Sequence, residues 1–97
     1  MAATNKLEVI AILRVKLNAT CRNAPEQEWH TDWQISTPSK TCVLYLNDND
    51  GYTEFEDKKI DSVANTAVIF DTNIKHRGVS ATNVDRRLVL NVSYFEA

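Results

Sequence analysis

The segment Leu7-Glu-Val-Ile-Ala-Ile-Leu-Arg-Val-Lys-Leu17 decides the fold class. Every second residue from Leu7 to Leu17 is apolar, and the alternate positions include Glu8, Arg14 and Lys16. Successive side chains of a β-strand point to opposite faces, so this two-residue period predicts a strand. Its Val and Ile residues also favour a strand over the short helix that Leu7–Leu13 alone would allow.

Further strands are predicted along the chain, where short apolar runs lie between turn sequences, most clearly Asn47-Asp-Asn-Asp-Gly51. About eight short antiparallel strands in one domain indicate a sandwich, a barrel or a jelly roll. Strand content alone does not choose among the three. The expected strands cover residues 7–17, 28–32, 41–47, 51–55, 57–60, 66–70, 74–77 and 87–95.

Length and composition indicate one globular domain over residues 1–97, of which 1–6 are polar and expected to be frayed. A net charge of −2 predicts no nucleic-acid partner. No apolar run approaches the roughly 20 residues of a membrane span, and the start lacks a signal peptide. Cys21 and Cys42 are too few for a disulfide framework. We therefore expect a cytoplasmic protein without a membrane partner.

Two histidines and one carboxylate form a candidate metal site. His30 and Asp32 lie two residues apart, which puts both side chains on one face of a strand. His76 follows the apolar strand at 66–70. Two His and one carboxylate form the facial triad of non-haem iron(II) oxygenases. A His-x-Asp pair alone is common, however, and a lone histidine is more often a surface or core residue.

Arg87 opens the last strand and is a candidate anion ligand. Alternation puts it on the same face as Val89, Asn91 and Ser93. A guanidinium on an inner face suits a carboxylate, because it binds carboxylates bidentately and stays charged when desolvated. Tyr45 could donate a hydrogen bond to the same carboxylate. The simpler interpretations are an ion pair of Arg87 with Asp85 and ordinary core packing of Tyr45.

The order and spacing of several segments resemble the prolyl 4-hydroxylase-like branch of the 2-oxoglutarate/Fe(II)-dependent dioxygenases. The resemblance covers roughly residues 9 to 95. Its segments are His30-Thr-Asp32, Thr41-Cys-Val-Leu-Tyr-Leu-Asn47, Gly51-Tyr-Thr-Glu-Phe55, Ala67-Val-Ile-Phe-Asp71, His76 and Arg87.

This resemblance implies an all-β double-stranded β-helix, the cupin-like jelly roll. It implies that Fe(II) is bound by His30, Asp32 and His76, that Arg87 pairs with the distal carboxylate of 2-oxoglutarate, and that Tyr45 donates to it. There are departures from the family pattern. Val89 stands where many members have a hydroxyl residue, the usual Gly-Gly is Asp50-Gly51, and the usual N-terminal helices have no room in this chain.

The implied reaction is a hydroxylase reaction that consumes O2 and 2-oxoglutarate, with ascorbate as a supporting reductant. The primary substrate would be a peptide, with a prolyl residue as the family's commonest target, or a small molecule. Three alternatives remain: a non-catalytic cupin-like jelly roll that binds a metal or small ligand, a zinc hydrolase with the same ligands, and a structural interaction module. The first leaves Arg87 and Tyr45 unexplained, the second leaves Arg87 without a role, and the third treats both histidines as coincidence.

The same alternation predicts an apolar outer face. If Arg87, Asn91, Tyr45 and Asn47 face a pocket, the side chains between them point outward. Leaving such a face in water would forgo on the order of 10 kcal/mol. We therefore expect a homodimer through this face, or a chain that is the C-terminal part of a longer protein. The outward residues are Leu88, Leu90, Val92, Tyr94, Cys42, Leu44 and Leu46.

Overall fold

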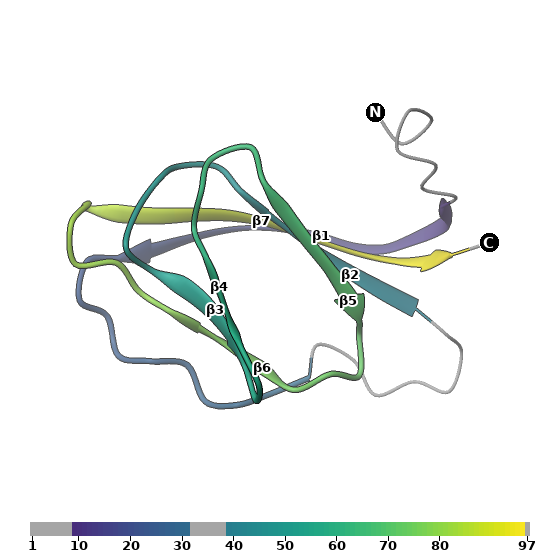
Figure 1. The fold of residues 1–97 in the computed structure, drawn as a ribbon. Helices are drawn as coiled ribbons and strands as arrows, with labels where there is room; N and C mark the ends of the chain where they lie inside the picture. The colour runs from purple at the N-terminus through teal and green to yellow at the C-terminus, as the bar shows by residue number, and fades with distance from the viewer. Residues whose placement is uncertain (1–8, 32–38, 97) are drawn as a thin grey trace.

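The computed structural model describes residues 9–31 and 39–96. Within these residues, seven strands form two antiparallel sheets that face each other (Figure 1). The four-stranded sheet has the order β1-β7-β2-β5 and contains β1 (Val9–Cys21), β2 (Ser39–Tyr45), β5 (Ala67–Asp71) and β7 (Arg86–Glu96). The three-stranded sheet has the order β4-β3-β6 and contains β3 (Tyr52–Phe55), β4 (Lys59–Asp61) and β6 (His76–Val79).

The predicted all-β fold class is confirmed, and each strand lies within a few residues of its expected place. The expected strand at 28–32 is the exception, since its described residues form only an isolated bridge between His30 and His76. The chain from Arg22 to Trp29 has no strand assignment. It lies along β6 through single bonds such as Gln27 N–H to the Gly78 carbonyl, at 3.3 Å.

The inner space between the sheets is apolar at one side and polar at the other. Val43, Tyr45, Phe55, Phe70 and Val89 form the buried core. Towards β1 the inward side chains become polar, because alternation turns the charged face of β1 inward and its apolar face outward. The resulting outward residues Val15 and Leu17 are 56% and 61% exposed.

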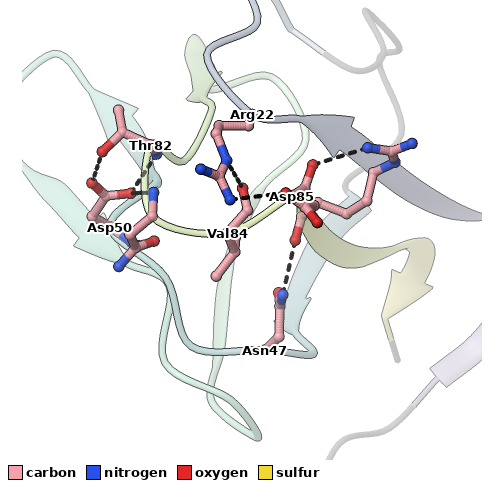
Figure 2. Close-up of polar contacts among 8 residues, drawn as sticks. Arg22, Asn47, Asp50, Thr82, Val84 and Asp85 are labelled. Carbon is pink, nitrogen blue, oxygen red and sulfur yellow. Dashed lines mark hydrogen bonds and ion pairs between the residues drawn. The ribbon is translucent and has the colours of Figure 1, made fainter.

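Three loops meet at one end of the molecule, where β7 begins. Asp50 accepts hydrogen bonds from the Thr82 backbone N–H, at 2.6 Å, and from the Thr82 hydroxyl (Figure 2). Arg22, just after β1, forms an ion pair with Asp85 at 2.8 Å. These contacts join the β2–β3 loop, the end of β1 and the β6–β7 loop directly before Arg87.

One expected orientation and one expected exposure are wrong. Asn47 was expected to face the pocket, but β2 ends at Tyr45 and Asn47 lies in the following loop. There its side chain donates to the Arg86 carbonyl at 2.9 Å and accepts from the Leu88 N–H at 3.0 Å, which fixes the start of β7. Tyr94 was expected on the exposed face and is only 2% exposed. Among the described residues, no helix is long and apolar enough to cross a membrane.

Candidate functional site

A cavity of about 280 Å³ opens between the two sheets on the polar side of the interior. Arg87 and Asn91 line it from β7, and Thr53, His76 and Gly78 line it from the smaller sheet. His30 lines it from the segment that lies along β6. The cavity therefore brings together three of the predicted site residues: His30, His76 and Arg87. Of the other two, Asp32 lies outside the described residues, and Tyr45 does not line the cavity.

His30 and His76 are held side by side by backbone bonds. Each N–H donates to the other residue's carbonyl, at 3.0 and 2.9 Å. The Nδ1 atoms contact the carbonyl oxygens of Glu28 and Ile74 at 2.9 and 3.0 Å. A carbonyl can only accept, so each Nδ1 carries a proton, and Nε2 is the atom of the neutral ring that could bind a metal. Metal-binding histidines use the same arrangement, with one ring nitrogen donating to a carbonyl and the other facing the metal.

The spacing of the two rings fits one shared metal ion. With metal–nitrogen bonds of about 2.1 Å at right angles, two imidazole centroids would lie about 4.5 Å apart. The observed centroids are 4.6 Å apart, with the rings tilted by 50°. His76 is buried and packs edge-on against Phe70, with centroids 4.8 Å apart, which fixes its ring. Within the described residues, no group of three or more potential metal ligands occurs; the predicted third ligand, Asp32, is not among them.

Arg87 is a buried cation without a described acidic partner. Arg87 lies at the N-terminal end of β7, and the residue is only 6% exposed. Nε donates to the Ser62 hydroxyl at 3.1 Å and Nη2 donates to Thr53 Oγ1 at 3.2 Å. No carboxylate of the described residues forms an ion pair with it, so the expected alternative, an ion pair with Asp85, is wrong: Asp85 pairs with Arg22. Burial lowers the pKa of Arg87 from its ordinary value, yet a guanidinium stays charged in proteins.

Tyr45 lies behind Arg87 and does not line the cavity. It is completely buried, and its hydroxyl donates to Thr53 Oγ1 at 2.9 Å. The Arg87 guanidinium carbon lies 5.8 Å from the centre of the Tyr45 ring. Burial raises the pKa of Tyr45 and outweighs the lowering effects of the Thr53 hydrogen bond and of Arg87. Tyr45 is therefore a neutral donor, and it reaches the Arg87 end of the cavity through Thr53.

Two glycines make room for the Arg87 side chain. A Cβ at Gly51 would lie 2.6 Å from Arg87 Cδ and 2.7 Å from the Val79 carbonyl oxygen. A Cβ at Gly78 would lie 3.4 Å from Arg87 Nη1. A Cβ less than 3 Å from these atoms would force Arg87 or the backbone to shift. Of the two glycines, Gly51 therefore lies closer to the Arg87 side chain. A side chain at position 51 would therefore collide with Arg87.

The cavity is strongly cationic. Arg14 and Lys16 of β1 line it together with Arg87, and no Asp or Glu of the described residues does so. Cross-strand register places Arg14 beside Ser93 and Lys16 beside Asn91. The Asn91 Oδ1 atom is buried without a hydrogen-bond partner in the described structure. The positive charge of this wall attracts an anion. The Asn91 Oδ1 atom can in addition accept a hydrogen bond from a ligand that carries a donor.

Sequence reasoning missed Thr53 and Ser62 as neighbours of Arg87. Thr53 was visible in the Gly51-Tyr-Thr-Glu-Phe55 segment, because alternation in that strand puts it on the same face as Gly51 and Phe55. Its pairing with Gly78 in β6 brings it into the cavity. Ser62 lies beyond β4 and carries no local signal of its place. Thr53 supplies a hydroxyl to Arg87, which the residue at position 89, a valine, cannot do.

Comparison with known proteins supports the fold. The chain is similar in structure to a cupin protein from Bacteroides fragilis, with a TM-score of 0.66 and 15% sequence identity. The similarity covers 84% of this chain and 64% of that protein, so the chain spans less than two thirds of its neighbour. No protein-family model matches, and no curated protein matches. The fold is thus a cupin-like jelly roll, as predicted.

Proposed function

We propose that this chain is an Fe(II)- and 2-oxoglutarate-dependent oxygenase that hydroxylates its substrate. The observation that carries the proposal is the position of Arg87, a buried cation that lines the same cavity as the His30–His76 pair. Burying a charge without a partner is costly, and a bound carboxylate would remove that cost. In this proposal, the metal bound by His30 and His76 and the guanidinium of Arg87 contact the same co-substrate.

The spacing of the two parts supports a short dicarboxylate. Arg87 Nη1 lies near Gly78, which is two residues from His76 on the same strand. Two residues of a strand span about 6.7 Å. 2-Oxoglutarate has its two carboxylates at opposite ends of a five-carbon chain, so its distal carboxylate can reach Arg87 while its keto-acid end faces the metal.

The proposed roles follow from these contacts. His30 and His76 hold Fe(II) through Nε2, with Asp32 as the proposed third ligand. When bound, the iron and 2-oxoglutarate together supply the oxidising chemistry with O2, and ascorbate supports turnover. Arg87 binds the distal carboxylate, Thr53 and Ser62 orient the guanidinium, and Tyr45 orients Thr53. The apolar core residues Phe55 and Phe70 keep water from the His76 side of the cavity.

The cations of β1 indicate the class of primary substrate. Lys16 lies beside Asn91, and Arg14 lies further along β1, so their Cα atoms are about 13–20 Å along the sheet from the end of β1 that pairs with Arg87. They therefore enter the cavity from the other end of the sheet. We propose that they receive an anionic group of the primary substrate, either an acidic peptide around a prolyl residue or an acidic small molecule. Succinate production should then rise more with an acidic proline-containing peptide than with its basic counterpart, and Lys16→Glu should reverse that order.

The decisive experiment is co-substrate binding and turnover by the purified chain. Binding of 2-oxoglutarate to the Fe(II)-loaded protein is measured without oxygen, and succinate formation is measured with oxygen and ascorbate. Arg87→Lys keeps the charge but loses the bidentate fork, so 2-oxoglutarate affinity should fall by about 1.5–3 kcal/mol, roughly 10- to 100-fold. Metal affinity should stay nearly unchanged.

Arg86→Lys is the matched control, because Arg86 is the exposed neighbour whose guanidinium, within the described residues, bonds only to the Asp85 carbonyl. Equal 2-oxoglutarate affinity in the Arg87→Lys and Arg86→Lys variants would remove Arg87 from the site. The second candidate function is a non-catalytic cupin-like protein that binds a metal or small ligand, which the structural similarity to a cupin favours. Binding of metal and 2-oxoglutarate without any succinate formation would favour that candidate. The predicted cytoplasmic location stays a prediction.

A further inference from the structure

Gln27 attaches the segment before His30 to β6 by two hydrogen bonds to one residue. Its backbone N–H donates to the Gly78 carbonyl at 3.3 Å, and its side-chain Oε1 accepts from the Gly78 N–H at 2.7 Å. A backbone N–H can only donate, which fixes the orientation of the side-chain amide, with Oε1 facing Gly78. Nε2 is therefore the other atom of the amide, and within the described residues it has no hydrogen-bond partner.

The guanidinium of Arg87 also has one nitrogen that the surrounding residues do not bind. Nε and Nη2 donate to the hydroxyls of Ser62 and Thr53. In the part of the chain that the structure describes, Nη1 donates to no acceptor. Because the other two nitrogens hold the guanidinium in place, Nη1 is the nitrogen that a ligand in the cavity can use.

The Gln27 amide and Arg87 Nη1 lie around one point on the cavity side of Gly78. Alternation in β6 puts Gly78 on the same face as His76, and both residues line the cavity. A Cβ at Gly78 would lie 2.9 Å from Gln27 Oε1, 3.4 Å from Gln27 Cδ and 3.4 Å from Arg87 Nη1. Gln27 lines the cavity and is exposed, so this point lies at the mouth of the cavity.

We propose that Gln27 Nε2 and Arg87 Nη1 bind the two oxygens of one carboxylate, which makes Gln27 a second residue that selects the co-substrate. The inference rests on the proposed function, in which this carboxylate is the distal one of 2-oxoglutarate. A carboxylate only accepts hydrogen bonds, and it binds most strongly to donors that are already held in position. A 2-oxo acid without a distal carboxylate uses neither donor, so the pair selects dicarboxylic over monocarboxylic 2-oxo acids.

Gln27→Glu tests the pair because it changes only one of the two ends of the amide. One carboxylate oxygen keeps the bond to the Gly78 N–H, while the other replaces the Nε2 donor with an acceptor beside Arg87. Affinity of the Mn(II)-loaded protein for 2-oxoglutarate should fall at least about tenfold, the scale of a lost hydrogen bond to a charged group. Affinity for pyruvate, which has the same 2-oxo acid group but no distal carboxylate, should not change. Isothermal titration measures both.

Asn23→Asp is the matched control, because it makes the same amide-to-carboxylate change in the same segment. Asn23 is exposed and is not one of the residues that line the cavity. Its φ of 57° is a conformation that Asp adopts as Asn does. Both affinities should therefore stay as they are in the natural protein.

Thermal unfolding without metal or 2-oxoglutarate gives a second, independent measurement on the same variant. A buried cation gains stability from an acidic partner, and the carboxylate of Gln27→Glu would lie where the carboxylate of 2-oxoglutarate binds. Tm of the variant should therefore rise by about 4–8 °C. If Gln27 only attached its segment to β6, the substitution would keep that bond and give no such rise.

Weaker 2-oxoglutarate binding with unchanged pyruvate binding and a higher Tm supports the pair, even when the protein forms no succinate. In that case the carboxylate site stands and the oxygenase proposal fails. If Gln27→Glu binds 2-oxoglutarate as tightly as Asn23→Asp while Arg87→Lys does not, Gln27 is not part of the site and the oxygenase proposal stands. A Tm that does not rise, or an equal loss of affinity for both 2-oxo acids, overturns the pair as well, because the substitution then disturbs the cavity as a whole.

Discussion

The hydroxyl of Thr53 is the point at which the core and the candidate site meet. It accepts from Tyr45 on one side and from Arg87 on the other. Of these three residues, Arg87 and Tyr45 could be identified from the sequence, because each had a residue type and a strand position typical of a carboxylate site. The contact between Tyr45 and Arg87 through Thr53 could not, since it depends on how β3 packs against the other sheet.

Thr53→Val should destabilise the protein. The substitution keeps the shape of the side chain but leaves the buried Tyr45 hydroxyl and one Arg87 N–H without their acceptor, which costs about 1–3 kcal/mol. Urea unfolding measures the loss. Tyr45→Phe removes only the donor and should cost about 0.5–1.5 kcal/mol.

The double variant decides whether these two residues act through one another. Once Thr53 is valine, Tyr45→Phe removes a hydroxyl that already lacks its partner, so the second substitution should be nearly neutral. The coupling between the two positions should therefore lie at about 0.5–3 kcal/mol, the range seen for residues in contact. Additive effects in the four-protein cycle would show that the hydrogen bond contributes nothing to stability.

At the level of single elements, the sequence predicts most strands correctly because alternation is a local property. It fails where partners decide the outcome. The segment around His30 was expected to be a strand, yet among its described residues the one β-bridge to β6 is between His30 and His76. Asn47 was expected in β2, but its side chain satisfies backbone groups at the start of β7 instead. Both errors come from contacts with residues far away in the chain.

The loop from Asn47 to Gly51 allows a test of close packing at Arg87. In Gly51→Ala, the added Cβ would meet Arg87 Cδ and the Val79 carbonyl, and backbone cannot easily move away. We expect a loss of about 1–3 kcal/mol in unfolding free energy, as for other overpacked positions. Gly78→Ala should cost less, because its nearest neighbour is the flexible end of Gln27, 2.9 Å away. Thermal unfolding of both variants checks the order, and an equal or reversed order would contradict it.

The contacts of Asp50 across the loops predict a pH dependence of stability (Figure 2). Hydrogen bonds from the Thr82 hydroxyl and backbone hold the pKa of Asp50 below its ordinary value of 3.8. The folded carboxyl therefore binds its proton less readily than the unfolded one, and folding favours the charged form. Its contribution is fully present above that ordinary value and is lost as pH falls through the lower folded-state pKa.

Asp50→Asn should therefore be less stable than the natural protein at pH 7, and the difference should shrink as the pH falls below about 4. Urea unfolding between pH 3 and pH 7 measures the difference. Asp57→Asn is the control, because Asp57 is an exposed carboxylate in the β3–β4 turn and lies outside the loop cluster. A difference that stays constant with pH would mean that the charge of Asp50 plays no part.

At the scale of the whole molecule, the net charge of the sequence does not show how charge is distributed in the structure. The chain has a net charge of −2, yet three cations line the cavity without a described carboxylate. The apolar residues on the outer side of the four-stranded sheet were predicted in part: Cys42, Leu44, Leu88, Leu90 and Val92 all point outward as expected. The contribution of Val15 and Leu17 was not foreseen, because the pairing of β1 with β7 cannot be read from either strand alone.

The stability of the whole domain should respond to metal and co-substrate in a defined order. A ligand that binds only the folded state adds about 2.7 kcal/mol at 100 times its dissociation constant. For a domain of this size that corresponds to a rise of roughly 10–20 °C in Tm.

Fe(II) in the absence of oxygen, or Mn(II) as its substitute, should raise Tm on its own. Addition of 2-oxoglutarate should raise Tm further only when metal is present. His30→Ala should abolish both increments, whereas Arg87→Lys should keep the metal increment and reduce the second. Equal stabilisation by 2-oxoglutarate in the presence and absence of metal would mean that the two do not share the cavity.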